Sequence, residues 1–120
     1  MDNQNLVTIY KVKEISIAHK LSLPYKSKCN KMHGHNFKIE IWVKGKVTST
    51  GMVIDFNKLK DEVMKYDHTY LNDLIEIPTA ENLAIKLCNE IYSLSEKTFS
   101  SVKIRVWETT SAYAETRIEK

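Results

Sequence analysis

The sequence has few of the residues that interrupt a fold and little net charge. Three glycines and two prolines occur among 120 residues, so no segment is typical of a linker or a low-complexity tail. The net charge is +3, and the lysines are scattered without the basic stripe or interleaved aromatics that nucleic-acid binding requires. We expect one globular domain over residues 1–120 with no direct nucleic-acid partner. The mild positive charge is compatible with a polyanionic small molecule.

Long apolar runs, an export signal and a cysteine framework are missing as well. Residues 1–5 are polar, and every apolar run is far shorter than the roughly 20 residues of a membrane helix. The chain has two cysteines, Cys29 and Cys88, and cytosolic thiols stay reduced, so we expect no disulfide. These absences predict a cytoplasmic protein without a membrane partner.

Two kinds of hydrophobic periodicity are present. Apolar residues at every second position predict strands, and apolar residues three and four apart predict helices. The expected strands span residues 6–18, 37–47, 102–108 and 113–118. The first helix is expected over about residues 56–66, with Asp55 or Asn57 as its N-cap. A second helix is expected to begin at Pro78 or Thr79, because proline suits a first helical turn.

The predicted order of elements is strand, strand, helix, helix, strand, strand. Runs of like elements favour an α+β fold, with a four-stranded antiparallel sheet and both helices on one face. No segment of a 120-residue chain is left to cover the opposite face of the sheet. Because large exposed apolar patches are rare on monomers, this arrangement predicts a homo-oligomer.

Three of the four histidines share one face of the first two predicted strands. Side chains two residues apart on a strand point to the same side, so His33 and His35 project together. His19 is in phase with the core residue Ile17. If the strands pair, three imidazoles converge, a set typical of catalytic zinc with an open fourth position. Gly34 between two ligands would allow close approach of substrate or backbone. The alternative is that each histidine is a hydrogen-bonded core residue.

Cys29 lies in a polar segment, residues 20–32, that predicts a loop just before His33. Its thiolate would serve as a base or a nucleophile, because neighbouring cations or metals favour the ionised form. Alternatively, Cys29 is a fourth zinc ligand and closes a structural site. Cys88 falls on the core stripe of the second helix, where it is most simply a small buried hydrophobe.

Two further polar features are candidates for function. Asp67 and His68 adjoin where the first helix ends, and a carboxylate there would orient an imidazole for proton transfer. Alternatively, they are an ordinary surface helix end. Glu108 follows the inward face of its strand, where a carboxylate needs a partner. It would suit two N–H donors on a pterin or guanine edge, or simply pair with a lysine or arginine.

Taken in order, these segments resemble the superfamily of the 6-pyruvoyltetrahydropterin and 6-carboxytetrahydropterin synthases. The resemblance spans nearly the whole chain without large insertions, and its motifs are jointly specific. The matching segments are residues 17–21, 29–37, 51–56, 66–72, 78–82 and 108–109. One departure is Tyr66, where the family often has leucine before the Asp-His pair, a change of packing that removes no catalytic group.

The resemblance implies a tunnelling fold whose subunits assemble into barrels, with active sites between neighbouring subunits and a hexamer favoured. It implies that the protein binds zinc through His19, His33 and His35, and that Cys29 is the catalytic base.

The resemblance also implies roles for residues of the second half of the chain. Asp67 and His68 would form a catalytic dyad contributed by an adjacent subunit. Glu108 would anchor the pterin ring, and Thr79 and Glu81 would help to line that pocket.

The spacing of Cys29 from the His-Gly-His motif distinguishes branches of the superfamily. Three residues separate them here, as in the bacterial 6-carboxytetrahydropterin synthases, whereas pyruvoyl-forming enzymes usually have two more, and another branch has glutamate near this position. The resemblance thus implies a lyase of queuosine precursor synthesis, converting 7,8-dihydroneopterin triphosphate to 6-carboxytetrahydropterin, acetaldehyde and triphosphate. Two alternatives stay open: a pyruvoyl-forming synthase, and a non-catalytic zinc- or pterin-binding module.

Overall fold

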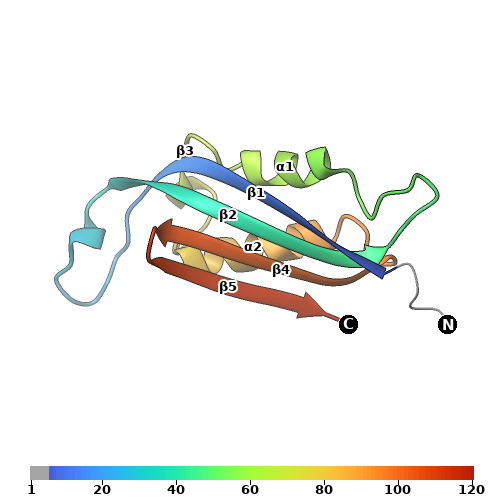
Figure 1. Cartoon of the computed structure of the whole chain (residues 1–120). Coiled ribbons are helices and arrows are strands. Elements are labelled where there is room, and N and C mark those ends of the chain that lie inside the picture. Colours follow the sequence, from blue (N-terminus) through green and yellow to red (C-terminus); the bar gives the residue numbers. More distant parts are fainter. Residues whose placement is uncertain (1–5) are drawn as a thin grey trace.

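The computed structural model describes residues 6–120, so the polar N-terminal residues 1–5 discussed above lie outside the described part. Figure 1 shows a long, twisted sheet with two helices behind it. The elements are β1 (Leu6–His19), η1 (Lys28–Asn30), β2 (His33–Lys46), α1 (Phe56–Met64), β3 (Thr69–Tyr70), η2 (Leu71–Asp73), α2 (Ala80–Tyr92), β4 (Phe99–Thr109) and β5 (Ala112–Glu119).

The sheet has the strand order β3-β1-β2-β4-β5. β1 and β2 form an antiparallel ribbon that runs without interruption from the Leu6–Lys46 pair to the His19–His33 pair. β4 and β5 continue the sheet in antiparallel fashion. The predicted α+β class is confirmed, but the sheet is mixed, because the unpredicted strand β3 pairs in parallel with β1. Two residues are too few for an alternating pattern to reveal such a strand.

Both helices cover one face of the sheet, as predicted (Figure 1). The alternating residues of β2 that begin with Phe37 are fully buried against them, and so are Leu59 and Val63 of α1 and Leu87 of α2. Removing this much apolar surface from water is the main favourable term in folding, at about 25 cal/mol per Å². Cys88 is buried in the same core, as expected, and no helix of residues 6–120 is long and apolar enough to span a bilayer.

Side-chain caps define where the helices begin. The Asp55 carboxylate accepts a hydrogen bond from the backbone N–H of Asn57 at 2.8 Å, which identifies Asp55 rather than Asn57 as the N-cap of α1. The Thr79 hydroxyl accepts from the backbone N–H of Asn82 at 3.1 Å and caps α2. α1 ends at Met64, two residues earlier than predicted.

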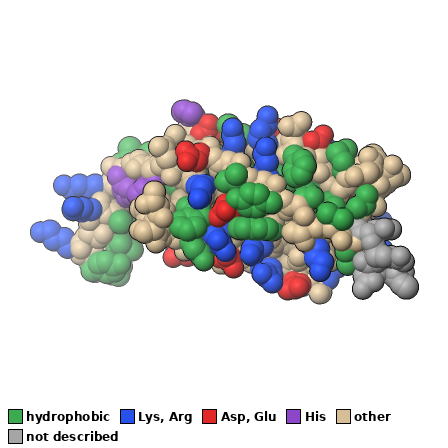
Figure 2. Space-filling model, viewed as in Figure 1, with side chains coloured by type: hydrophobic (Ala, Val, Ile, Leu, Met, Phe, Trp, Pro, Cys, Tyr) green, Lys and Arg blue, Asp and Glu red, His purple; other side chains and the backbone are tan. Residues whose placement is uncertain are grey.

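The opposite face of the sheet receives no helix from residues 6–120, and Figure 2 shows hydrophobic side chains there interleaved with charged ones. Trp42 lies on this face, where Tyr10 packs against it with ring centroids 5.1 Å apart. The Lys103 ammonium lies 4.1 Å from the centre of the Trp42 ring. This cation–π contact therefore covers part of the Trp42 ring, which no helix of the described chain shields on this face of the sheet.

Candidate active site

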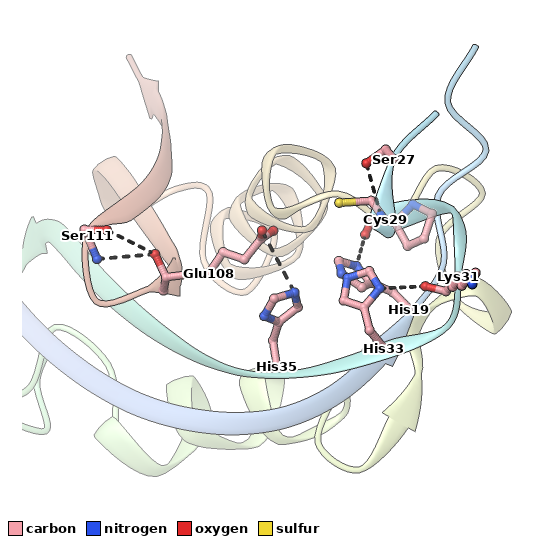
Figure 3. Close-up of polar contacts among 10 residues, drawn as sticks. His19, Ser27, Cys29, Lys31, His33, His35, Glu108 and Ser111 are labelled. Atoms are coloured by element: carbon pink, nitrogen blue, oxygen red, sulfur yellow. Dashed lines mark hydrogen bonds and ion pairs between the residues drawn. The ribbon is translucent and has the colours of Figure 1, made fainter. Parts of the chain in front are cut away.

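The end of the β1–β2 ribbon brings three imidazoles together, as the strand parity predicts. His19 pairs directly with His33, and His35 pairs with Ile17 on the same face. One potential ligand atom from each imidazole lies within 4.8 Å of the other two. The ring centroid of His19 lies 4.5 Å from that of His33 and 5.2 Å from that of His35. Figure 3 shows the three rings grouped on one side of the ribbon.

Backbone carbonyls orient two of these rings. His19 Nδ1 lies 2.7 Å from the Pro78 carbonyl oxygen, and His33 Nδ1 lies 2.7 Å from the Lys31 carbonyl oxygen. A carbonyl can only accept, so each Nδ1 carries the proton and each Nε2 keeps a free lone pair. Metal-bound histidines are generally oriented in this way by a hydrogen bond from the other ring nitrogen.

The buried imidazole of His19 supplies a direct test of whether the site fits a metal. His19 is only 1% exposed, and its Nε2 has no hydrogen-bond partner among residues 6–120. A buried polar atom without a partner is costly, and such atoms are rare in native proteins. A cation bound at the three converging nitrogens would satisfy it, so the residues present fit a metal ion.

His35 occupies the side of the triad nearest Glu108. Its Nε2 lies 4.0 Å from Glu108 Oε2, and the carboxylate is partly exposed. Burial lowers the pKa of His35, the positive field of the other two histidines acts in the same direction, and Glu108 opposes the shift. The neutral imidazole, which is the form that binds metals, is therefore favoured.

The β1–β2 loop places Cys29 beside the triad. The backbone N–H of Cys29 donates to the Ser27 hydroxyl at 3.1 Å, and its carbonyl accepts from the N–H of Leu21 at 2.8 Å. In Figure 3 the sulfur points from the loop toward the side of the triad where Glu108 lies. The imidazoles form the metal-competent group without Cys29, an arrangement that favours an open fourth position over a closed Cys-His site.

The Asp67–His68 pair is formed between α1 and β3, where it is bonded to β1 and, among the described residues, not to the triad. Asp67 Oδ2 lies 2.9 Å from His68 Nδ1, while Asp67 Oδ1 accepts from the backbone N–H of Ser16 at 2.8 Å. That backbone hydrogen bond lowers the pKa of Asp67, so the carboxylate stays ionised beside the imidazole. The His68 N–H donates to the Ser16 carbonyl at 2.7 Å, and the exposed His68 has a φ of 57°. Within residues 6–120, no hydrogen bond or ion pair joins either side chain to the triad.

The remaining predicted site residues, Thr79 and Glu81, lie at the start of α2. The Thr79 side chain is engaged as the N-cap, and Glu81 is exposed in the first turn of α2. Sequence reasoning missed the Pro78 carbonyl that orients His19, because a backbone contact between residues 59 positions apart leaves no pattern in the chain. It treated Tyr66 as a change of packing and missed that the hydroxyl of this buried residue donates to Glu90 at 2.6 Å.

The fold and the triad together define a class: an α+β protein of the tunnelling fold with three histidines able to hold a metal. This chain is similar to the solved structure of Caenorhabditis elegans 6-pyruvoyl tetrahydropterin synthase. The TM-score is 0.70 at 28% sequence identity, and the match covers 100% of this chain and 99% of that one.

Sequence comparison identifies the family. The family model for 6-pyruvoyl tetrahydropterin synthase matches residues 8–119. A protein of Archaeoglobus fulgidus, provisionally named 6-carboxy-5,6,7,8-tetrahydropterin synthase, is 46% identical over 106 residues, covering 85% of this chain and 88% of the relative. The dihydroneopterin monophosphate aldolase of Pyrococcus furiosus is 36% identical over 81 residues, covering 64% and 70%. The chain belongs to the 6-pyruvoyl tetrahydropterin synthase family.

Proposed function

We propose that this protein is a zinc-dependent carbon–carbon lyase that converts 7,8-dihydroneopterin triphosphate to 6-carboxy-5,6,7,8-tetrahydropterin, acetaldehyde and triphosphate. The observation that carries the proposal is the unpartnered Nε2 of buried His19 within a three-histidine group, in a chain 46% identical to a relative named for this product. The proposal places the enzyme in the cytoplasm, in the synthesis of queuosine and other 7-deazapurines.

We assign a separate role in the reaction to the triad and to each of its neighbours. His19, His33 and His35 would hold zinc, which when bound supplies a Lewis acid for the oxygens of the substrate side chain. Cys29 would remove and return protons beside that side chain. Glu108 would accept hydrogen bonds from the pterin ring, with Thr79 and Glu81 lining the ring pocket.

The lack of any bond between the Asp67–His68 dyad and the triad within residues 6–120 supports an active site shared between subunits. The dyad is hydrogen-bonded to the backbone of Ser16 in β1, and no hydrogen bond or ion pair within residues 6–120 joins it to the triad. We therefore expect a homo-oligomer, most simply a hexamer, in which the dyad of one subunit completes the triad of its neighbour. An assembly would also cover the open face of the sheet.

Product analysis tests the activity directly. Mass spectrometry after incubation of the zinc-loaded protein with 7,8-dihydroneopterin triphosphate should detect 6-carboxytetrahydropterin together with acetaldehyde. A 6-pyruvoyltetrahydropterin product would assign the sister activity instead. Turnover of the monophosphate alone would assign the aldolase activity for which the Pyrococcus furiosus relative is named.

Substitution of Cys29 separates an enzyme from a structural zinc module. We expect Cys29→Ala to abolish turnover and to keep the full metal content, because the imidazoles alone form the ligand group. Cys88→Ala is the matched control for removal of a thiol, and it should retain activity, since Cys88 is a buried residue of α2 whose sulfur lies 3.5 Å from the carbonyl oxygen of Val102, the partner of Val43. Loss of metal in Cys29→Ala would instead identify Cys29 as a closing ligand and contradict the proposed role.

A further inference from the structure

The basic residues are distributed more unevenly than the net charge suggests. Residues 15–39 contain five lysines and no aspartate or glutamate. The remaining 13 basic residues of the chain are outnumbered by its 15 acidic ones. The whole positive excess of the protein therefore belongs to the segment that also carries Cys29 and the three histidines.

The fold gathers most of these lysines at one end of the molecule. Figure 2 shows lysine side chains at the end where the β1–β2 loop lies in Figure 1, next to a group of histidines. Lys26, Lys28 and Lys31 line, with Ser27, a hollow of about 370 Å³. All three are exposed, and among residues 6–120 no carboxylate pairs with any of them.

Hydrogen bonds hold the loop that carries these lysines in a defined shape. The Asn30 side chain accepts from the N–H of Leu23 at 2.9 Å and donates to the carbonyl of Tyr25 at 3.1 Å. At the base of the loop, the Asn72 side chain donates to the Lys20 carbonyl at 2.8 Å and accepts from the Lys20 N–H at 2.9 Å. A braced loop loses less conformational entropy when it binds a ligand than a free one does.

The loop is also joined to the metal site. The Lys31 carbonyl orients His33, and Cys29 lies between Lys28 and Lys31. Figure 3 shows Glu108 on one side of the histidine group and Lys31 on the other. A ligand that extends from Glu108 across the triad would reach the lysines at its far end.

We propose that Lys26, Lys28 and Lys31 form a polyphosphate subsite that binds the phosphorylated end of the substrate side chain. This inference rests on the proposed function, because the order ring, hydroxylated side chain, phosphate in the substrate matches the order Glu108, triad, lysines. An ammonium group offers three donors and a full charge to phosphate oxygens, and lysine is a common phosphate ligand. The subsite would favour triphosphate over monophosphate, since three lysines line one hollow.

Binding of inorganic triphosphate tests the subsite without turnover. Calorimetry on the purified holoprotein would compare the wild type with the triple variant Lys26→Gln, Lys28→Gln, Lys31→Gln. We expect the Kd to rise about 10- to 100-fold, as three partly exposed ion pairs imply, and to depend on salt in the wild type. The control is Lys58→Gln, Lys60→Gln, Lys97→Gln, which removes equal charge from α1 and the α2–β4 turn and should bind like the wild type.

Kinetics separate failure of the subsite from failure of the proposed function. With the triphosphate substrate, the loop variant should lose kcat/KM by a similar factor, mainly through KM, while its zinc content and Tm stay at wild-type values. Normal kcat/KM in the loop variant would overturn the subsite and leave the lyase standing. Tight, lysine-dependent binding of inorganic triphosphate by a protein that turns over no pterin would refute the lyase and keep the polyphosphate site. Equal weakening in both triple variants would show a general charge effect and overturn the subsite.

Discussion

At the scale of single residues, the imidazole of His19 is the most constrained group of the site. It is buried, its Nδ1 is hydrogen-bonded to the Pro78 carbonyl, and its Nε2 has no hydrogen-bond partner in the described part of the chain. His33 and His35 are more exposed; a carbonyl orients His33 at the same 2.7 Å, whereas the nearest carboxylate oxygen to His35 lies 4.0 Å away. His19 should therefore be the ligand whose loss affects the metal most.

The first prediction concerns this ligand. His19→Ala should lose nearly all bound zinc, because two imidazoles and water hold the ion far less well than three imidazoles do. Metal content by atomic emission spectroscopy on the purified protein measures this. His68→Ala is the matched control, since His68 is the one histidine outside the triad, and it should keep its zinc. Full zinc in His19→Ala would contradict the assigned ligand set.

At the scale of elements, the sheet depends on contacts between strands that are distant in sequence. Glu40 of β2 accepts hydrogen bonds from the Tyr10 hydroxyl of β1 at 2.6 Å and from the Trp107 indole of β4 at 2.5 Å. Burial acts to raise the pKa of Glu40, but these two hydrogen bonds and the nearby Lys38 and Arg105 lower it, so the carboxylate stays ionised. One carboxylate thus connects three strands on the open face.

This network predicts a pH dependence on the alkaline side. The hydrogen bond to Glu40, with burial and the charge of Glu40, raises the pKa of Tyr10 to about 12. Because the folded-state pKa lies above the unfolded value of about 10, the contribution to stability is complete below pH 10 and is lost as pH rises toward 12. Subtracting the 295 nm titration of Tyr10→Phe from that of the wild type isolates this phenol. In Glu40→Gln the Tyr10 pKa should return toward 10, and an unchanged value would exclude Glu40 as the cause.

A second prediction at this scale concerns Gly45, near the end of β2, where the strand packs against the turn before β4. A Cβ on Gly45 would come within 2.8 Å of the Thr98 carbonyl oxygen and 3.1 Å of Val53 Cγ1. Gly45→Ala should lower the free energy of unfolding by about 1–3 kcal/mol, as overpacking does, in chemical denaturation. Gly34→Ala is the control, since its Cβ would make an ordinary 3.5 Å contact with the Ile17 carbonyl oxygen. Equal stability of the two variants would show that the backbone near Gly45 shifts to accommodate the added methyl group, and it would contradict the prediction.

At the scale of the whole molecule, the chain is 55 × 25 × 24 Å, with one face of its sheet open to solvent. Within residues 6–120 of this elongated subunit, no hydrogen bond or ion pair joins the histidine triad to the Asp67–His68 dyad. A dyad that takes part in the reaction therefore comes either from another copy of the chain or from the same subunit across the bound substrate.

Subunit complementation distinguishes these possibilities. Cys29→Ala and His68→Ala should each be inactive alone, and coexpression of the two chains should restore activity. In a random mixture about a quarter of the shared sites would combine an intact Cys29 from one chain with an intact His68 from its neighbour. Turnover by purified mixed oligomers measures the recovery. If mixed oligomers form but stay inactive, both groups act within one subunit and the shared site is wrong.

The sequence by itself determined the features that have a local period. Strand parity placed His19, His33 and His35 on one face, and helical spacing with local caps placed both helices close to their true starts. The start of β2 was predicted less well from the sequence. β2 begins at His33, four residues before the predicted strand, because pairing with β1 continues beyond the segment of alternating apolar residues.

Only the tertiary structure decided the contacts between distant segments. The Pro78 carbonyl that orients His19 and the attachment of Asp67 to Ser16 both join residues that no repeat or motif connects. Such contacts depend on how elements pack in three dimensions, whereas periodicity records only which face of each element is buried. The sequence therefore indicated which groups carry the chemistry, and the fold determined which of them can meet within one subunit.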